Sequence, residues 1–313
     1  MRVVFFGTSE FAVDVLNALH EDPRFEIPMV VSQPSSRSGR GQKTTSTALV
    51  KAAEELELNT FLPMDANDAD SVEQLKAQNA DLFITAAYGQ KLSDEVLGLP
   101  VGPSLNLHGS LLPRHRGAAP VQFSILEGDT VTGVSLMRMT DRMDAGPVYA
   151  TAETPIEVDD TGGSLMERLG KMAGQLILDH AGDVLAGKLE GKEQDEEAAT
   201  AAPSLAKEQG RVPWNTSAIQ IDRHVRGMTP WPSAFTFCPT DRSPARVQVV
   251  KGEILDLPSP AMPGTVVAFT TGIEVATTKG VYRILEVKRS GKRSLEAVEF
   301  LRGFPLPVGS RLQ

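Results

Sequence analysis

Residues 2–19 read RVVFFGTSEFAVDVLNAL, and this stretch decides the fold of the first half of the chain. Its apolar run Val3–Phe6 predicts a buried strand, and the apolar spacing over Glu10–Leu19 predicts a helix. Gly7 stands at the turn between them. This turn has only the first glycine of the dinucleotide-binding fingerprint, which argues against an NAD site.

The same alternation of strand and helix continues through the N-terminal half. Apolar runs predict further strands at Met29–Val31, Leu82–Ala87, Leu105–Leu107 and Val134–Met137. Helical patterns lie between them at Ala48–Leu56 and Ser71–Gln78. Strands that alternate with helices form βαβ units, so we expect an α/β domain with a doubly wound, mostly parallel, Rossmann-like sheet.

The C-terminal third has a different pattern. Residues 191–208 are acidic and alanine-rich and contain Pro203, which is typical of a linker. Short β-like runs follow, and glycine and proline separate them, so they predict a smaller, OB-like β-barrel. We therefore expect a first domain at 1–190, a linker at 191–208 and a second domain at 209–313.

The net charge of −9 conceals an asymmetry between the two parts of the chain. Residues 209–313 carry a net charge of +6, whereas residues 1–208 carry −15. A basic domain suits a polyanionic partner, although a solvated basic surface would give the same composition. Composition alone leaves both interpretations open.

Cysteine usage and hydropathy point to a cytoplasmic protein. Cys238 is the one cysteine, which excludes an internal disulfide and a thiolate metal cluster. The chain starts directly with a strand pattern, and no apolar run approaches the length of a membrane span. We expect a cytoplasmic chain with no membrane contact and no bound metal.

The segment from Ser104 to Pro120 carries the residues best suited to chemistry. Asn106 and His108 are two residues apart on a predicted strand, so their side chains lie on the same face. An amide can stabilise a developing oxyanion, and an imidazole can move protons near neutral pH, which together suit acyl transfer. Two satisfied polar residues near a core would give the same pattern.

A carboxylate would complete such a site. Asp144 lies in a loop that follows the strand Val134–Met139, and we expect this loop at the same edge of the sheet as His108. A carboxylate beside an imidazole favours its charged form or orients a nucleophile. Asp141 lies in the same loop, and the residues alone do not decide between the two.

The segment resembles the signature of the 10-formyltetrahydrofolate-dependent formyltransferases. That signature is Asn-x-His followed by Ser-Leu-Leu-Pro-Arg-x-Arg-Gly-Ala-Ala-Pro, and residues 106–120 match it. The family's aspartate lies in an Asp-x-Gly turn 36 residues after the histidine, as Asp144 does here. Two positions depart from the pattern: His115 stands where an aromatic residue is common, and Pro147 where an acidic residue is common.

The resemblance extends over nearly the whole chain, from the opening strand to Thr229–Phe235. It implies the branch of the family that formylates methionyl initiator tRNA for translation initiation, with 10-formyltetrahydrofolate as co-substrate. It assigns catalysis to Asn106, His108 and Asp144, without a metal. It places the folate beside Ser110, Leu111, Leu112 and Pro113, and the loop with Tyr88 and Gly89 also ends at this edge of the sheet.

Two basic segments are candidates for binding tRNA. One is the loop that contains Arg37, Arg40 and Lys43, and the resemblance implies that it reads the acceptor stem, with Arg40 as the expected reader. The other is the basic turn, which we define as Lys288, Arg289, Lys292 and Arg293. Solvated surface is the alternative for each. We expect a monomer.

Two other classes of protein remain open. A formyltransferase for a sugar nucleotide or another small amine would share the first domain and the catalytic residues. It would leave the basic C-terminal domain and the Arg37–Lys43 loop unexplained. A non-catalytic RNA-binding protein would explain the charge asymmetry but not the combination of Asn106, His108 and Asp144.

Overall fold

The computed structural model describes residues 1–34, 36–38, 43–241, 243–259 and 261–313, and only the backbone of 36–38 and 43–45. These residues form two compact units. Unit 1 comprises Met1–Val121, Val131–Pro155 and Leu165–Ser204, and unit 2 comprises Gln122–Thr130, Ile156–Ser164 and Leu205–Gln313. The limits of independent domains that we inferred from the sequence stay a prediction.

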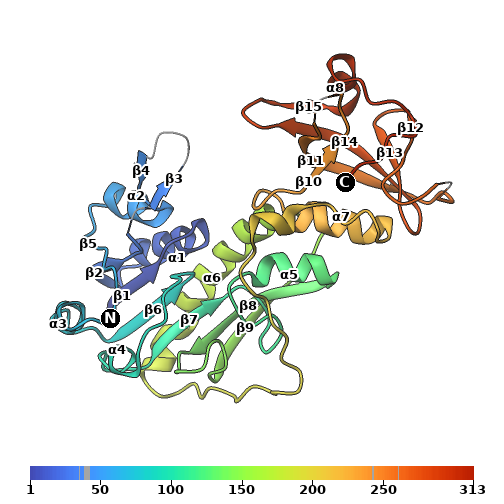
Figure 1. Cartoon of the computed structure of the whole chain (residues 1–313). Helices are drawn as coiled ribbons and strands as arrows, with labels where there is room; N and C mark the ends of the chain where they lie inside the picture. The colour runs from blue at the N-terminus through green and yellow to red at the C-terminus, as the bar shows by residue number, and fades with distance from the viewer. Residues whose placement is uncertain (35, 39–42, 242, 260) are drawn as a thin grey trace. The chain divides into compact units, whose positions relative to one another are not determined.

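Unit 1 is built on a seven-stranded sheet with the order β5-β2-β1-β6-β7-β8-β9 (Figure 1). The strands are β1 (Arg2–Gly7), β2 (Glu26–Val31), β5 (Thr60–Phe61), β6 (Leu82–Ala86), β7 (Ser104–His108), β8 (Val131–Arg138) and β9 (Val148–Pro155). The first five are mutually parallel, which confirms the mostly parallel, Rossmann-like sheet. Each expected strand falls on one of these seven.

The remaining elements of the first half connect the strands or form a small hairpin. They are α1 (Glu10–Glu21), α2 (Ala48–Glu55), α3 (Ala69–Lys76), α4 (Asp94–Leu97), α5 (Pro120–Glu127), α6 (Gly162–Leu185), β3 (Ser36–Ser38) and β4 (Lys43–Thr45). Strands β3 and β4 pair antiparallel, with Arg37 opposite Thr44. The loop that we expected around Arg37 and Lys43 therefore begins and ends in two paired, antiparallel strands.

The last two strands of the sheet differ from the expected pattern. Strand β8 runs antiparallel to β7, with Leu105 opposite Arg138, and β9 runs antiparallel to β8. The loop after β8 therefore starts beside the beginning of β7, not beside its carboxyl end. We expected this loop to follow β8 at the sheet edge where β7 ends, and that expectation was wrong. Apolar periodicity predicts that a strand exists but not in which direction it runs.

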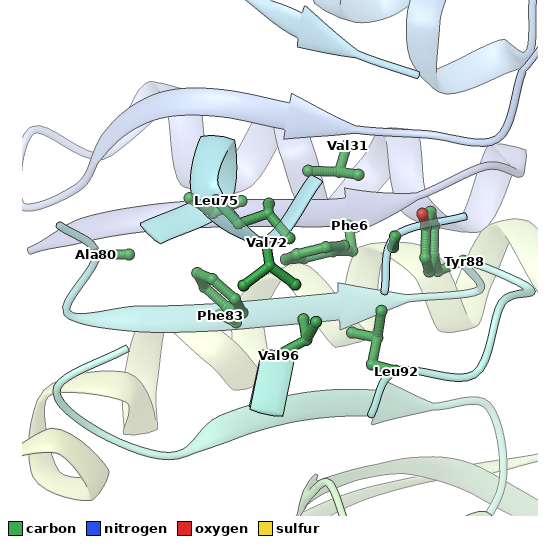
Figure 2. Packing of buried hydrophobic residues seen from close by; sticks show 11 residues of the cluster. Phe6, Val31, Val72, Leu75, Ala80, Phe83, Tyr88, Leu92 and Val96 are labelled. Carbon is green, nitrogen blue, oxygen red and sulfur yellow. The ribbon is translucent and has the colours of Figure 1, made fainter. Parts of the chain in front are cut away.

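An apolar cluster covers one face of the sheet and supports the loop after β6 (Figure 2). The rings of Phe6 and Phe83 lie 5.1 Å apart, and the ring of Tyr88 meets Phe6 edge-on at 5.4 Å. Side chains from α3 and α4 complete the cluster, among them Val72, Leu75 and Val96. Each such side chain contributes roughly 1.5–3 kcal/mol when fully buried, so the cluster fixes the start of this loop firmly.

Unit 2 contains an antiparallel sheet with the order β10-β11-β14-β13-β12, and β15 pairs with β14. Its elements are η1 (Lys207–Gly210), α7 (Ala218–Gly227), β10 (Phe235–Cys238), β11 (Ala245–Leu255), β12 (Val266–Phe269), β13 (Ile273–Ala276), β14 (Val281–Arg289), β15 (Ser294–Glu296) and α8 (Ala297–Gly303). Among the described residues no pairing joins β10 to β12, so the sheet is a partly open, curled barrel. This confirms the second, β-rich domain.

Within the described ranges, no helix is long and apolar enough to cross a membrane.

A buried histidine lies on α7. His224 is 9% exposed, and its Nε2 has no hydrogen-bond partner among the described residues. Burial lowers the pKa of His224 below its ordinary value of 6.5, and a backbone hydrogen bond to Gly210 only partly opposes this effect. The unfolded chain therefore binds a proton at this position before the folded chain does.

Stability should consequently fall in mild acid. The contribution of neutral His224 is complete above its unfolded pKa and is lost as the pH falls toward the lower folded value. We expect the melting temperature to drop between about pH 8 and about pH 5, and we expect His224→Gln to show a smaller drop. The exposed His20 supplies the control, since His20→Gln should follow the wild-type curve. Equal slopes for His224→Gln and wild type would contradict this assignment.

Candidate active site

Strand β7 carries the two polar side chains singled out by the sequence. Leu105 and Leu107 are buried on one face, and Asn106 and His108 lie on the other. His108 is 5% exposed, whereas Asn106 is partly exposed. The Asn106 side chain makes no hydrogen bond to the described part of the chain, so its amide is available to a ligand.

The contacts of His108 determine which of its nitrogens can exchange a proton. Nε2 lies 2.9 Å from the carbonyl oxygen of His115. A carbonyl only accepts, so Nε2 carries hydrogen, and Nδ1 is the nitrogen that gains or loses one. Nδ1 lies 3.7 Å from Oδ2 of Asp144. The carboxylate therefore faces the exchangeable position of the imidazole.

Asp144 lies in the loop between β8 and β9 and adopts a left-handed backbone conformation with φ 51°. Its Oδ2 accepts a hydrogen bond of 2.9 Å from the backbone N–H of Gly117. The structure thus brings Asp144 to His108, although through a hairpin and not through parallel strand ends. The rival Asp141 is exposed.

The expected folate segment, Ser110–Pro113, is held by hydrogen bonds to its own neighbourhood. The Ser110 hydroxyl is fully buried and donates to the carbonyl of Arg114 at 2.6 Å. Ser135 on β8 donates to the Ser110 carbonyl at 2.7 Å and accepts from the Leu112 N–H at 3.0 Å. Ser110 and Ser135 thus shape this loop, while Leu111, Leu112 and Pro113 stay partly exposed.

Tyr88 and Gly89 lie in the loop after β6. The Tyr88 side chain is 2% exposed within the apolar cluster, and burial raises its pKa to about 12. Its backbone carbonyl accepts from the Thr8 hydroxyl at 2.8 Å. Tyr88 is therefore placed to shape the loop through its ring, and only its backbone, with Gly89, is available to a ligand.

The longest-range contacts of the site come from residues 192–202, and no sequence pattern predicted them. The backbone N–H of Arg116 donates to Thr200 at 2.8 Å, and the Ala202 N–H donates to Arg116 at 2.7 Å. Glu196 pairs with Arg116 at 3.0 Å and with Arg142 at 2.7 Å. These guanidinium groups, Arg116 first, lower the pKa of Glu196 to about 2.

This segment overlaps the expected linker, 191–208. Its polar residues pair with loops of unit 1 instead of meeting only solvent, and composition cannot distinguish these two situations. Arg116 belongs to the signature motif. Its positive charge is the one sequence feature that could have suggested a partner for the acidic residues of 191–208.

The basic candidates are placed to different extents. Arg40 lies outside the described residues, and for Arg37 and Lys43 the structure gives only the backbone in β3 and β4. The basic turn joins β14 to β15, and all four of its members are exposed: Lys288, Arg289, Lys292 and Arg293.

The environment of the basic turn includes aromatic surface. The Arg289 guanidinium lies 5.8 Å from the Phe304 ring centroid, and Arg293 pairs with Glu299 at 2.9 Å. Arg289, Lys292 and Arg293 line one side of a hollow of about 350 Å³ in unit 2. Within the described residues, no group of three or more His, Cys, Asp or Glu side chains is arranged to hold a metal ion.

Two family models match the chain. The model described as Formyl transferase matches residues 1–180, and that described as Formyl transferase, C-terminal domain, matches residues 204–305. A methionyl-tRNA formyltransferase of Methylococcus capsulatus is 38% identical over 312 residues, which cover 100% of this chain and 99% of that relative. One of Bacillus cereus is 36% identical over 318 residues, covering 100% and 98%.

Solved structures share the fold at low sequence identity. An N-formyltransferase of Helicobacter canadensis, in complex with folinic acid and dTDP-3-aminofucose, has a TM-score of 0.65 at 13% identity over 90% of this chain and 97% of that one. HypX of Aquifex aeolicus, in complex with tetrahydrofolic acid, has a TM-score of 0.63 at 19% identity over 98% of this chain and 48% of that one.

Gly117 should tolerate no side chain. Its φ is +129°, and a Cβ built on it would lie 2.5 Å from the carbonyl oxygen of Ala202, which is backbone and cannot give way cheaply. We expect Gly117→Ala to destabilise the fold by clearly more than Gly187→Ala. Gly187 also has a positive φ, +66°, but open space around it, so it reports only the backbone cost of about 1 kcal/mol. Similar losses of melting temperature in the two variants would refute the close approach.

Proposed function

This chain belongs to the formyl transferase family, and we propose that it moves a formyl group from 10-formyltetrahydrofolate to the α-amine of methionyl initiator tRNA, for translation initiation. The observation that carries the proposal is the end-to-end match, at 36–38% identity, to methionyl-tRNA formyltransferases. That match includes the basic C-terminal domain, and a polyanionic acceptor such as tRNA suits its charge.

The reaction is a direct displacement at the formyl carbon. The neutral amine of methionine attacks this carbon, a C–N bond forms, and negative charge develops on the formyl oxygen. The bond to N10 of the folate then breaks, the amine loses one proton, and N10 takes up one proton. The side chains must therefore stabilise an oxyanion and move a proton.

We assign these two tasks to three residues. Asn106 has an amide without a partner in the described chain, and it would donate N–H to the formyl oxygen. His108 would act through Nδ1, because Nε2 is engaged by the carbonyl of His115. Asp144 faces that nitrogen at 3.7 Å, where its carboxylate can help to accept the proton of the amine.

The formyl donor would lie against the loops that end near His108. Leu111, Leu112 and Pro113 are partly exposed, and the backbone of Tyr88 and Gly89 borders the same edge of the sheet. The buried Ser110 hydroxyl would serve by holding the loop. The co-substrate is used up in each turnover, and this scheme needs no metal.

We propose that tRNA binds through two basic surfaces. Exposed arginine and lysine side chains neutralise phosphates, and an arginine over an aromatic ring can also contact a base. The basic turn has both features, since Arg289 lies near Phe304. The residues proposed to contact tRNA are Arg37, Arg40, Lys43, Lys288, Arg289, Lys292 and Arg293. We expect the enzyme to work in the cytoplasm as a monomer.

A competition between acceptors tests the proposed substrate. Transfer of labelled formyl should be measured with methionylated initiator tRNA, methionylated elongator tRNA and an amino-sugar nucleotide. We expect kcat/KM to favour the initiator over the elongator by at least about tenfold, which is about 1.4 kcal/mol. Formylation of the amino sugar without formylation of tRNA would assign the chain to the sugar-nucleotide class.

Substitution of the three proposed catalytic residues tests the mechanism. Asn106→Ala, His108→Ala and Asp144→Ala should each lower kcat by at least about a hundredfold, the usual scale for losing an oxyanion donor or an acid–base group. Binding of tRNA should change little, because none of them carries a phosphate contact. Asp141→Ala is the matched control for the carboxylate. Wild-type kcat in any of the three variants would remove that residue from the mechanism.

A further inference from the structure

Gln194 is unlike its neighbours in the acidic segment. Glu193 and Asp195 are exposed on either side of it, whereas Gln194 is partly buried. Its Nε2 donates to the carbonyl of Asp144 at 2.9 Å and to the carbonyl of Gly146 at 2.7 Å. One amide therefore holds the backbone on both sides of Ala145.

The other end of the same amide is also engaged. Oε1 of Gln194 accepts from Nε of Arg116 at 3.1 Å and from Nη2 at 2.9 Å. The next residue, Gly117, donates its N–H to the Asp144 carboxylate. These contacts close a ring of hydrogen bonds through three segments: the Asp144 loop, residues 116–117, and Gln194.

The Asp144 loop has a particular need for such support. Asp144 is a non-glycine residue in the left-handed region, and residues in this region persist where their surroundings hold them. The distance from its carboxylate to His108 depends on this backbone, and at 3.7 Å the two groups are not joined by a direct hydrogen bond. An external contact must therefore set that distance.

We propose that Gln194 is a positioning residue for formyl transfer, which holds the Asp144 carboxylate in front of Nδ1 of His108. The inference rests on the proposed function, because it assumes that Asp144 acts through His108. Gln194 touches neither substrate nor His108 in this scheme. Its effect passes through the backbone carbonyls of the Asp144 loop.

Two substitutions separate the donor and acceptor ends of the amide. Gln194→Met removes both ends at similar volume, and Gln194→Glu keeps an acceptor for Arg116 but removes both donors. We expect kcat to fall about tenfold or more in both, because small misplacements of a reacting group slow catalysis steeply. KM for the formyl donor and for tRNA should stay within about twofold. Gln175→Met is the matched control on α6, where Gln175 donates to Asp179, and it should keep wild-type kcat.

A double-mutant cycle shows whether Gln194 acts through Asp144. Gln194→Met combined with Asp144→Asn should be no slower than Asp144→Asn alone. If the losses of kcat in the two single variants multiply in the double variant, the inference about Gln194 is wrong. It is also wrong if both Gln194 variants keep wild-type kcat while Asp144→Asn is slow. Neither result would contradict the proposed function. Wild-type kcat in Asp144→Asn would instead overturn the proposed role of Asp144, and this inference with it. If Gln194→Met fails to fold, Gln194→Glu, which retains a partner for Arg116, is used in the same cycle.

Discussion

The backbone of residues 115–117 is the constraint on which the site depends. The carbonyl of His115 fixes one nitrogen of His108, and the N–H of Gly117 fixes the carboxylate of Asp144. Both residues of this segment have positive φ, 61° at His115 and 129° at Gly117. Arg116 lies between them, and its backbone and side chain pair with residues far along the chain, which stabilises this path. The main chain of residues 115–117 therefore sets how the side chains of His108 and Asp144 face each other.

Much of the fold could be predicted from the sequence because its central strands are buried on both faces. Val3–Phe6 is a continuous apolar run and Leu82–Ala86 is apolar except for Thr85, and both strands form the parallel centre of the sheet. Strand β9 gave no such signal, because Val148–Pro155 contains small and polar residues and alternate positions of it are exposed. The direction of β8 was missed for a different reason: a run of buried residues has the same pattern in either direction.

The site was predictable where one motif carries it and unpredictable where distant segments meet. Asn106 and His108 share a strand face, which follows from their spacing. The contact of Asp144 with His108 was expected, but from a strand arrangement that the structure does not have. Gln194 and Ser135 carried no signal, since a glutamine beside acidic neighbours or a small serine within a strand is ordinary. Their contacts appear only when the chain has closed on itself.

The pairing of residues 116–119 with residues 200–202 bears on how the chain can be divided for study. A fragment that stops at residue 190, where composition changes, would expose the amide and carbonyl of Arg116 and lose the partner of the Ala119 N–H. It would keep every residue of the signature but would lack the backbone pairing with residues 200–202 that holds the end of the signature in place. A fragment that extends to Ser204 retains this backbone pairing, and it stops where the match to the C-terminal family domain begins. In this protein the motif and the unit that folds around it end at different places.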